Sequence, residues 1–211
     1  MDTYGAPLCR EGIFMKKLFI TAFEPFGGET INPSEKAVAL LPDVVGGCRL
    51  SKRTIPVTFG EAAECVIRAA EEIQPDVILC IGQAGGRDAV TPELVGINLQ
   101  YASIPDNSGA EPKDEPIKKG GETAYFSTLP VRAISEAIRT AGIPSRVSYS
   151  AGAYVCNDVL YTLLEKYHGT DTRVGFIHVP YTKEQGKEPS MELSDIVKAL
   201  TAAITCIGEA L

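Results

Sequence analysis

"RVGFIHVPY", residues 173–181, decides the fold together with a similar run, "DVILCIG", at residues 76–82. Both are short and apolar, which is typical of strands in a buried sheet. A helical pattern precedes each of them, at residues 156–167 and 60–74. Parallel strands need crossover connections, and both faces of such a sheet need cover. The sequence therefore predicts an α/β protein, a three-layer α/β/α sandwich with a mainly parallel central sheet.

The remaining elements continue this alternation of strands and helices. Ligands of such sheets gather at the carboxyl ends of the strands, so the residues that follow each strand are the first candidates for a functional site. Further strands are expected at residues 17–23, 50–57, 94–102 and 146–151, and further helices near residues 33–41, 130–141 and 191–208.

Composition limits the kind of protein this chain can be. It has 211 residues, 45% of them hydrophobic, and a net charge of −7, which allows one sizeable core and does not require two domains. The acidic balance argues against nucleic acid as a partner. No apolar run reaches the roughly 18 to 20 residues that span a bilayer, so we expect no membrane partner and a cytoplasmic location.

The first residues do not fit the fold pattern. "MDTYGAPLCREGIF", residues 1–14, has neither the basic start nor the apolar stretch of a signal peptide. We expect residues 1–14 to be a leader or an upstream extension and residues 15–211 to form a single domain. The six cysteines show no CxxC pair and no zinc-finger spacing, so we expect reduced thiols and no metal site.

Cys156 has two interpretations. It continues the apolar face of the helix predicted at residues 156–167, so it could simply be packed in the core. It also lies at the first turn of that helix, where free N–H groups and the helix dipole stabilise a thiolate. The preceding "AGA" allows a substrate carbonyl to approach both the sulfur and these N–H donors.

A cysteine nucleophile normally needs a base, and the chain has two histidines. His168 lies at a helix end before a glycine, as a C-terminal cap does, whereas His178 ends a buried strand. His178 is therefore the better candidate. A carboxylate should orient it; Glu93 stands just ahead of an apolar strand, and Asp106 is a competitor for the same role.

Two further motifs follow strands. "GQAGGR", residues 82–87, could cradle a phosphate, line a pocket or form a simple tight turn, and it matches neither of the usual nucleotide motifs. In "FEPFGG", residues 23–28, Phe23 and Phe26 could enclose a flat ligand or be ordinary core aromatics. The polar segment 104–122 is either a solvated loop, or a lid or subunit contact.

In order, eight motifs resemble the pyrrolidone-carboxylate peptidases, also called pyroglutamyl peptidases type I. The resemblance runs from about residue 16 to the end of the chain. The motifs are "FEPFGG", "INPS", "GQAGGR", "TPELVGIN", "IPDN", "YFSTLP", "AGAYVCN" and "HVPY".

The resemblance implies a cysteine exopeptidase that removes N-terminal pyroglutamyl residues from peptides through an acyl-enzyme, without metal or cofactor. The family's catalytic cysteine, histidine and glutamate would fall on Cys156, His178 and Glu93. Residues 15–211 would then be the peptidase domain. Members of the family are cytosolic and often tetrameric, so the resemblance implies a homo-oligomer.

The resemblance also implies a substrate pocket and some departures from the family. The ring-binding aromatics would fall on Phe23 and Phe26, and the glutamine of the glycine-rich motif on Gln83. The family usually has arginines where this chain has Leu94 and Ser103. The second of these arginines lies near the active site in the family, so its replacement by Ser103 is expected to weaken oxyanion stabilisation, alter the orientation of Glu93 or change the preferred substrate.

Two alternative functions remain open on the sequence. One is a phosphorylase-like nucleoside transferase that uses residues 82–87 for phosphate, which rests on fold analogy alone. The other is a catalytically weakened homologue that binds pyroglutamate, for which Leu94 and Ser103 are the reason.

Overall fold

The computed structural model describes residues 15–211. The leader expected at residues 1–14 lies outside the described residues, and the division of the chain at residue 15 stays a prediction. None of the helices described is long and apolar enough to cross a membrane.

The main sheet has six strands and is mainly parallel, which confirms the prediction. Its four long strands run parallel, and the two short edge strands run antiparallel to their neighbours. In spatial order the strands are β2 (Val44–Val45), β3 (Cys48–Ile55), β1 (Lys16–Phe23), β4 (Val77–Gln83), β8 (Arg173–Val179) and β5 (Thr91–Pro92).

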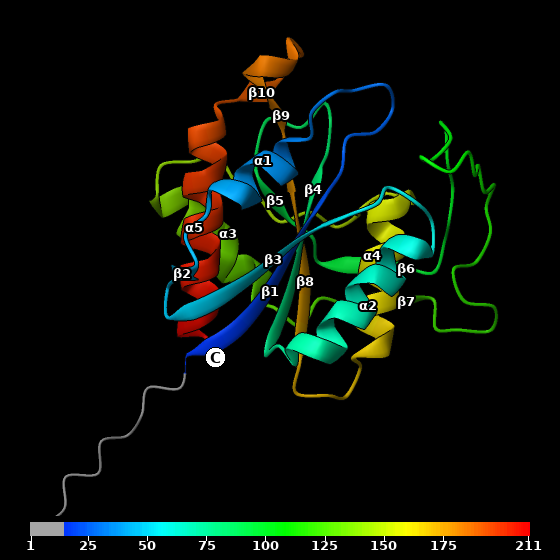
Figure 1. Cartoon of the computed structure of the whole chain (residues 1–211), viewed down its shortest axis with the longest axis horizontal. Coiled ribbons are helices and arrows are strands. Elements are labelled where there is room, and N and C mark those ends of the chain that lie inside the picture. Colours follow the sequence, from blue (N-terminus) through cyan, green and yellow to red (C-terminus); the bar gives the residue numbers. More distant parts are fainter. Residues whose placement is uncertain (1–14) are drawn as a thin grey trace, which may run out of the picture.

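Helices cover both faces of this sheet, as Figure 1 shows, and the predicted α/β/α sandwich is confirmed. The first layer consists of α1 (Pro33–Leu40), α3 (Val131–Thr140) and α5 (Leu193–Glu209), and the second of α2 (Glu61–Ile73) and α4 (Val155–Lys166).

Side chains of the central strands alternate between the two layers. In β4 and β8, the odd-numbered apolar residues pack against the α1/α3/α5 layer and the even-numbered ones against the α2/α4 layer. Successive side chains of a strand point to opposite faces. Gly82 and His178, at the carboxyl ends of these strands, therefore belong to the α2/α4 face.

One strand prediction is wrong in part and another is wrong. Of residues 94–102, only β6 (Val95–Ile97) is a strand, and it pairs with β7 (Ala124–Phe126) in a separate small sheet. Residues 146–151 form no strand; the bridges of this region are at Ser145 and Ser148. Serines there bond to nearby backbone groups instead, and such bonds compete with a strand ladder.

Two other segments complete the chain. Residues 104–122 are largely exposed and form no helix or strand, and a role as a lid or subunit contact stays a prediction. After β8, the chain forms β9 (Tyr181–Thr182), the short helix η1 (Lys183–Gln185) and β10 (Ser190–Met191), which pairs with β9.

Candidate active site

Cys156 is the second residue of α4 and lies at the carboxyl edge of the main sheet. Tyr154 occupies the N-cap position in an extended conformation, and no side chain caps this helix end. The first N–H groups of a helix have no partner within the helix. Gly152 takes a φ of +80°, a conformation that L side chains rarely adopt, and so turns the chain into the helix. The helix start thus offers both a thiol and free N–H donors.

The neighbours of Cys156 fix this helix start in place. The Asn157 side chain accepts from the Ile97 N–H at 2.9 Å and donates to the carbonyl oxygens of Ile97 and Leu99. The buried Asp158 carboxylate accepts from the Gly60 N–H at 2.8 Å. The cysteine is therefore held by polar side chains on the same turn, as well as by the apolar face of α4.

Gly82 allows the sulfur to approach the sheet. A Cβ at this position would lie 3.0 Å from Cys156 Sγ and 2.8 Å from the Phe176 ring, so no larger residue fits without movement. On the neighbouring strand, His178 is the register partner of Gly82. The His178 and Phe176 ring centroids are 4.7 Å apart. The thiol and the imidazole thus belong to one cluster above the ends of β4 and β8.

His178 contacts Glu93, and Asp106 does not take this role. His178 Nδ1 lies 2.7 Å from Glu93 Oε1, and both side chains are almost fully buried. With Glu93 ionised, Nδ1 is the donor, which leaves Nε2 as the free acceptor. Asp106 instead accepts hydrogen bonds from the Phe59 and Ala110 N–H groups. The other histidine, His168, is exposed.

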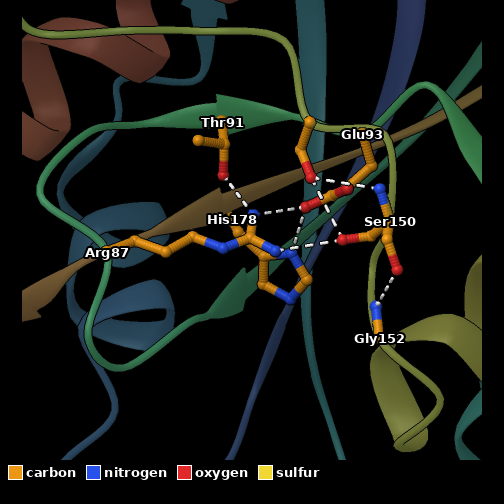
Figure 2. A network of polar contacts seen from close by, with 7 residues as sticks. Arg87, Thr91, Glu93, Ser150, Gly152 and His178 are labelled. Atoms are coloured by element: carbon orange, nitrogen blue, oxygen red, sulfur yellow. Dashed lines mark hydrogen bonds and ion pairs between the residues drawn. The ribbon is translucent and has the colours of Figure 1, made fainter.

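Arg87 is a member of this cluster that the sequence analysis missed. Its Nη1 lies 2.6 Å from Glu93 Oε1 and 2.5 Å from Thr91 Oγ1, and Nη2 lies 3.1 Å from the Ser150 carbonyl oxygen. Figure 2 shows these contacts beside the His178 ring. The final position of "GQAGGR", after a strand and six residues before Glu93, was the available signal.

A small pocket adjoins the sulfur. Its lining includes three residues predicted from the sequence, Phe23, Phe26 and Gln83, together with Cys156. It also includes Tyr154, whose ring centroid lies 6.1 Å from that of Phe26 and whose hydroxyl donates to a loop carbonyl. The pocket is largely apolar, as a site for an uncharged ring should be.

Gln83 lines the pocket, but its side-chain amide is bound to another residue. Its side-chain oxygen accepts a hydrogen bond at 2.9 Å from Gln185, beyond β9. Since alternate strand residues face opposite sides, the Gln83 side chain points away from the face that carries His178. The main chain of Gln83 is therefore the part that is available to a ligand.

The chain is similar to known proteins over almost its whole length. The sequence model of the family described as "Pyroglutamyl peptidase" matches residues 16–210. The chain is 47% identical to a pyrrolidone-carboxylate peptidase of Lactobacillus johnsonii, over 92% of this chain and 93% of that protein. It is 49% identical to one from Thermococcus onnurineus, over 89% of this chain and 96% of that protein.

This chain belongs to the pyroglutamyl peptidase family. Solved structures of the family have the same fold. The pyroglutamyl peptidase I of Bacillus amyloliquefaciens matches with a TM-score of 0.88 and 43% identity, over 92% of this chain and 97% of that one. The pyrrolidone carboxyl peptidase of Thermococcus litoralis matches with a TM-score of 0.86 and 40% identity, over 92% and 93%.

Membership of the pyroglutamyl peptidase family disfavours the phosphorylase-like alternative, and so does the packing of the glycine-rich turn. A Cβ on Gly85 would lie 2.1 Å from the Tyr181 hydroxyl. The space that glycine leaves open in this turn is therefore filled by a tyrosine. Among the residues described, no group of three or more His, Cys, Asp and Glu side chains could hold a metal ion.

The two departures from the family pattern do not leave Glu93 without a cationic partner. Leu94 is partly buried and Ser103 is exposed, so neither supplies a charge. The guanidinium of Arg87 lies against Glu93 instead. The expectation that Glu93 would be poorly oriented has to be weighed against this ion pair.

Burial dominates the protonation of the cluster. Desolvation, followed by the negative charge of Glu93, raises the pKa of Cys156 to about 12, although Arg87 and the Cys156 N–H oppose this shift. Desolvation also lowers the pKa of His178, against the effect of Glu93. The expected stabilisation of a thiolate by the helix start is therefore outweighed by burial. The resting pair is a thiol and a neutral imidazole.

Burial acts differently on the carboxylate. Burial alone would raise the pKa of Glu93, but the hydrogen bond with His178 and the charge of Arg87 hold it below its ordinary value. Glu93 is therefore ionised at neutral pH.

Cys156 and His178 are not hydrogen-bonded to each other in the part of the chain that the structure describes. Hydrogen bonds between catalytic groups often tighten only when substrate is bound.

Proposed function

We propose that this chain is a cysteine exopeptidase that removes an N-terminal pyroglutamyl residue from peptides, with Cys156 as nucleophile, His178 as base and acid, and Glu93 as the group that orients His178. The observation that carries the proposal is the buried contact of 2.7 Å between His178 and Glu93. It lies on the same face as Cys156 and the aromatic pocket.

Acylation begins from the neutral thiol and imidazole. When substrate closes the gap between them, His178 Nε2 takes the thiol proton, and the sulfur attacks the carbonyl carbon that joins the ring to the next residue. Glu93 stabilises the imidazolium that forms. The free N–H groups at the start of α4 are donors for the oxyanion.

The intermediate then releases the shortened peptide. The C–N bond breaks, His178 gives its proton to the leaving amine, and the pyroglutamyl group remains on the sulfur as a thioester. Water enters, His178 takes a proton from it, and the hydroxide oxygen attacks the thioester carbonyl. Cleavage of the C–S bond returns the proton to the sulfur and releases pyroglutamate.

The lining of the pocket suits the pyroglutamyl ring in its chemistry, and the cavity, about 10 Å³ in volume, has to open before a ring enters. The ring is flat and uncharged, and it has one lactam N–H and one lactam C=O. The side chains of Phe23 and Phe26 supply apolar walls, and the main chain at Gln83 supplies fixed polar groups. A charged clamp is not needed for such a ligand.

The experiment follows the release of a fluorescent amine from a pyroglutamyl amide. We expect turnover by fresh, reduced wild type, and none after treatment with iodoacetamide or in Cys156→Ser. An inactive wild type that binds pyroglutamate in calorimetry would favour the weakened homologue instead. Phosphate-dependent nucleoside cleavage that resists alkylation would favour the phosphorylase-like transferase.

The proposal extends to the domain bounds, the compartment and the oligomeric state of the enzyme. Residues 15–211 form the peptidase domain, preceded by residues 1–14, and the enzyme is a cytoplasmic homo-oligomer. Five cysteines lie in the described residues and all are free thiols, which supports a reducing compartment. Light scattering of the purified enzyme tests the oligomer, and a lone monomer would contradict that part.

A further inference from the structure

Arg87 joins three parts of the site with one guanidinium. From the loop between β4 and β5, it reaches the Glu93 carboxylate, the Thr91 hydroxyl and the Ser150 carbonyl oxygen. Thr91 is the register partner of His178 in the main sheet. Ser150 lies in the segment that leads to the nucleophile helix, and its hydroxyl accepts a hydrogen bond from the Gly152 N–H at 3.2 Å.

The burial of Glu93 makes this contact important. The Glu93 side chain has no exposed surface, and the Arg87 side chain is 25% exposed. Arg87 and His178 both approach Oε1, whereas the buried Oε2 has no hydrogen-bond partner among the described residues. A buried carboxylate is strongly disfavoured unless charged groups compensate it. His178 is neutral at rest, so Arg87 is the compensating charge.

We propose that Arg87 is a positioning residue of the active site: its guanidinium keeps Glu93 ionised and aimed at His178, and ties both to the segment that carries Cys156. This inference rests on the proposed function. Arg87 does not touch the reacting atoms in this scheme. It acts through Glu93 and through the segment at Ser150.

The planar fork of arginine suits this role. Two of its nitrogens reach three acceptors on two separate segments, which the single point charge of a lysine ammonium does not reproduce. The positive charge of Arg87 and its hydrogen bonds to two segments are therefore two separate contributions. A lysine would retain the charge near Glu93 but not the tie to residues 148–152.

The charge of Arg87 also predicts a pH effect. The ionisable groups that face Glu93 are His178 from β8 and Arg87 from its loop, and the Cys156 thiol of α4 experiences the charge of Glu93. Arg87 lowers the pKa of Glu93 and of His178. Its removal therefore raises both pKa values. Activity needs ionised Glu93 and neutral His178, so the acid limb of the pH profile should move to higher pH.

The test compares Arg87→Met, Arg87→Lys and a matched control, Arg146→Met. Arg146 forms an ion pair of the same length, 2.6 Å, with Asp88, but both partners are largely exposed. For each variant, kcat and KM for a pyroglutamyl amide are measured against pH, and the Tm is recorded by thermal unfolding.

We expect Arg87→Met to lower kcat about 10- to 100-fold with little change in KM, because the base is misplaced while the ring pocket is intact. Its acid limb should move to higher pH. Arg87→Lys should restore the acid limb but not the full kcat. Arg146→Met should match wild type in kcat and in the position of the acid limb.

Three results would overturn the inference. The first is an acid limb of Arg87→Met at the same pH as that of active wild type. The second is a kcat that falls in Arg146→Met as much as in Arg87→Met. The third is a wild-type kcat in Arg87→Lys. The lysine variant alone decides the matter if Arg87→Met does not fold. An inactive wild type would instead overturn the proposed function, so the two failures are distinct.

Discussion

The two faces of the central strands use the same backbone for different purposes. On the α1/α3/α5 face, β4 and β8 place Ile81 and Val179 near their carboxyl ends, and both are fully buried in an apolar core. On the α2/α4 face, the corresponding residues are Gly82 and His178. One face is filled with apolar side chains, while the other leaves room for a sulfur and buries an imidazole.

This difference shows how an active site is placed in a buried sheet. Because side chains alternate, two adjacent residues of one strand can supply packing on one face and chemistry on the other. The chemical face depends on a few polar contacts, such as that of Glu93 with His178. Substitutions on the two faces should therefore have separable effects, on catalysis and on stability.

The largest effect on catalysis is expected for Cys156→Ser. Loss of the nucleophilic sulfur should lower kcat on the order of 10³- to 10⁶-fold, with a nearly unchanged Tm. Cys206→Ser is the matched control, since Cys206 lies in the α1/α3/α5 layer at the edge of the other core. Turnover of the pyroglutamyl amide and thermal unfolding measure the two effects. An equal loss of turnover in Cys206→Ser would contradict the difference between the faces.

Glu93→Gln should be next in size. It keeps the volume of the side chain but removes the charge that stabilises the imidazolium, so kcat should fall on the order of 10²- to 10⁴-fold. Glu93 raises the pKa of His178, so its removal should move the acid limb of the residual activity to lower pH, opposite to Arg87→Met. Asp88→Asn, in an exposed ion pair, should leave the pH profile unchanged. If the acid limb of Glu93→Gln does not move, Glu93 does not act on His178 as proposed.

Gly82→Ala should have a smaller effect, limited to geometry. The added Cβ would press on Cys156 Sγ and the Phe176 ring, and a shift of about 1 Å can cost on the order of 10²-fold in rate. Gly175→Ala is the control on the opposite face, where the added Cβ would meet Leu129 at 2.4 Å. It should lower the Tm but retain kcat/KM. The same kcat/KM for both variants would show that Gly82 does not position the sulfur.

Ile204→Ala should have the smallest effect on catalysis and a large one on stability. Ile204 is fully buried on α5, and such a truncation costs about 2–5 kcal/mol of the free energy of unfolding. Denaturant unfolding measures this cost, and kcat/KM below the transition should equal that of wild type. A drop in kcat/KM comparable with that of Gly82→Ala would mean that the two faces are not independent.

Most of the fold could be predicted from the sequence because β4 and β8 are short apolar runs with a helix before each. The segment 146–151 could not be, since its serines bond to nearby backbone groups and the apolar pattern does not reveal this. The length of β6 was overestimated for a related reason, because residues 98–102 pair with loops through isolated contacts.

The candidate site was predictable where a residue stands at the end of a predicted element. Cys156 was found at the start of a helix, His178 at the end of a buried strand and Glu93 just ahead of an apolar one, and their catalytic roles stay predictions. Arg87 was missed, because only the folded chain brings it to Glu93 and Ser150. The raised pKa of Cys156 was missed as well, because a sequence shows the start of a helix but not how completely the surrounding side chains exclude water.

The most direct test of the central claim is to locate the acyl-enzyme. Wild type is quenched with acid during turnover of a pyroglutamyl amide, and its peptides are mapped by mass spectrometry. We predict a pyroglutamyl thioester on Cys156 and on no other cysteine, and none in Cys156→Ser. Turnover by wild type with the acyl group on another residue would contradict the account.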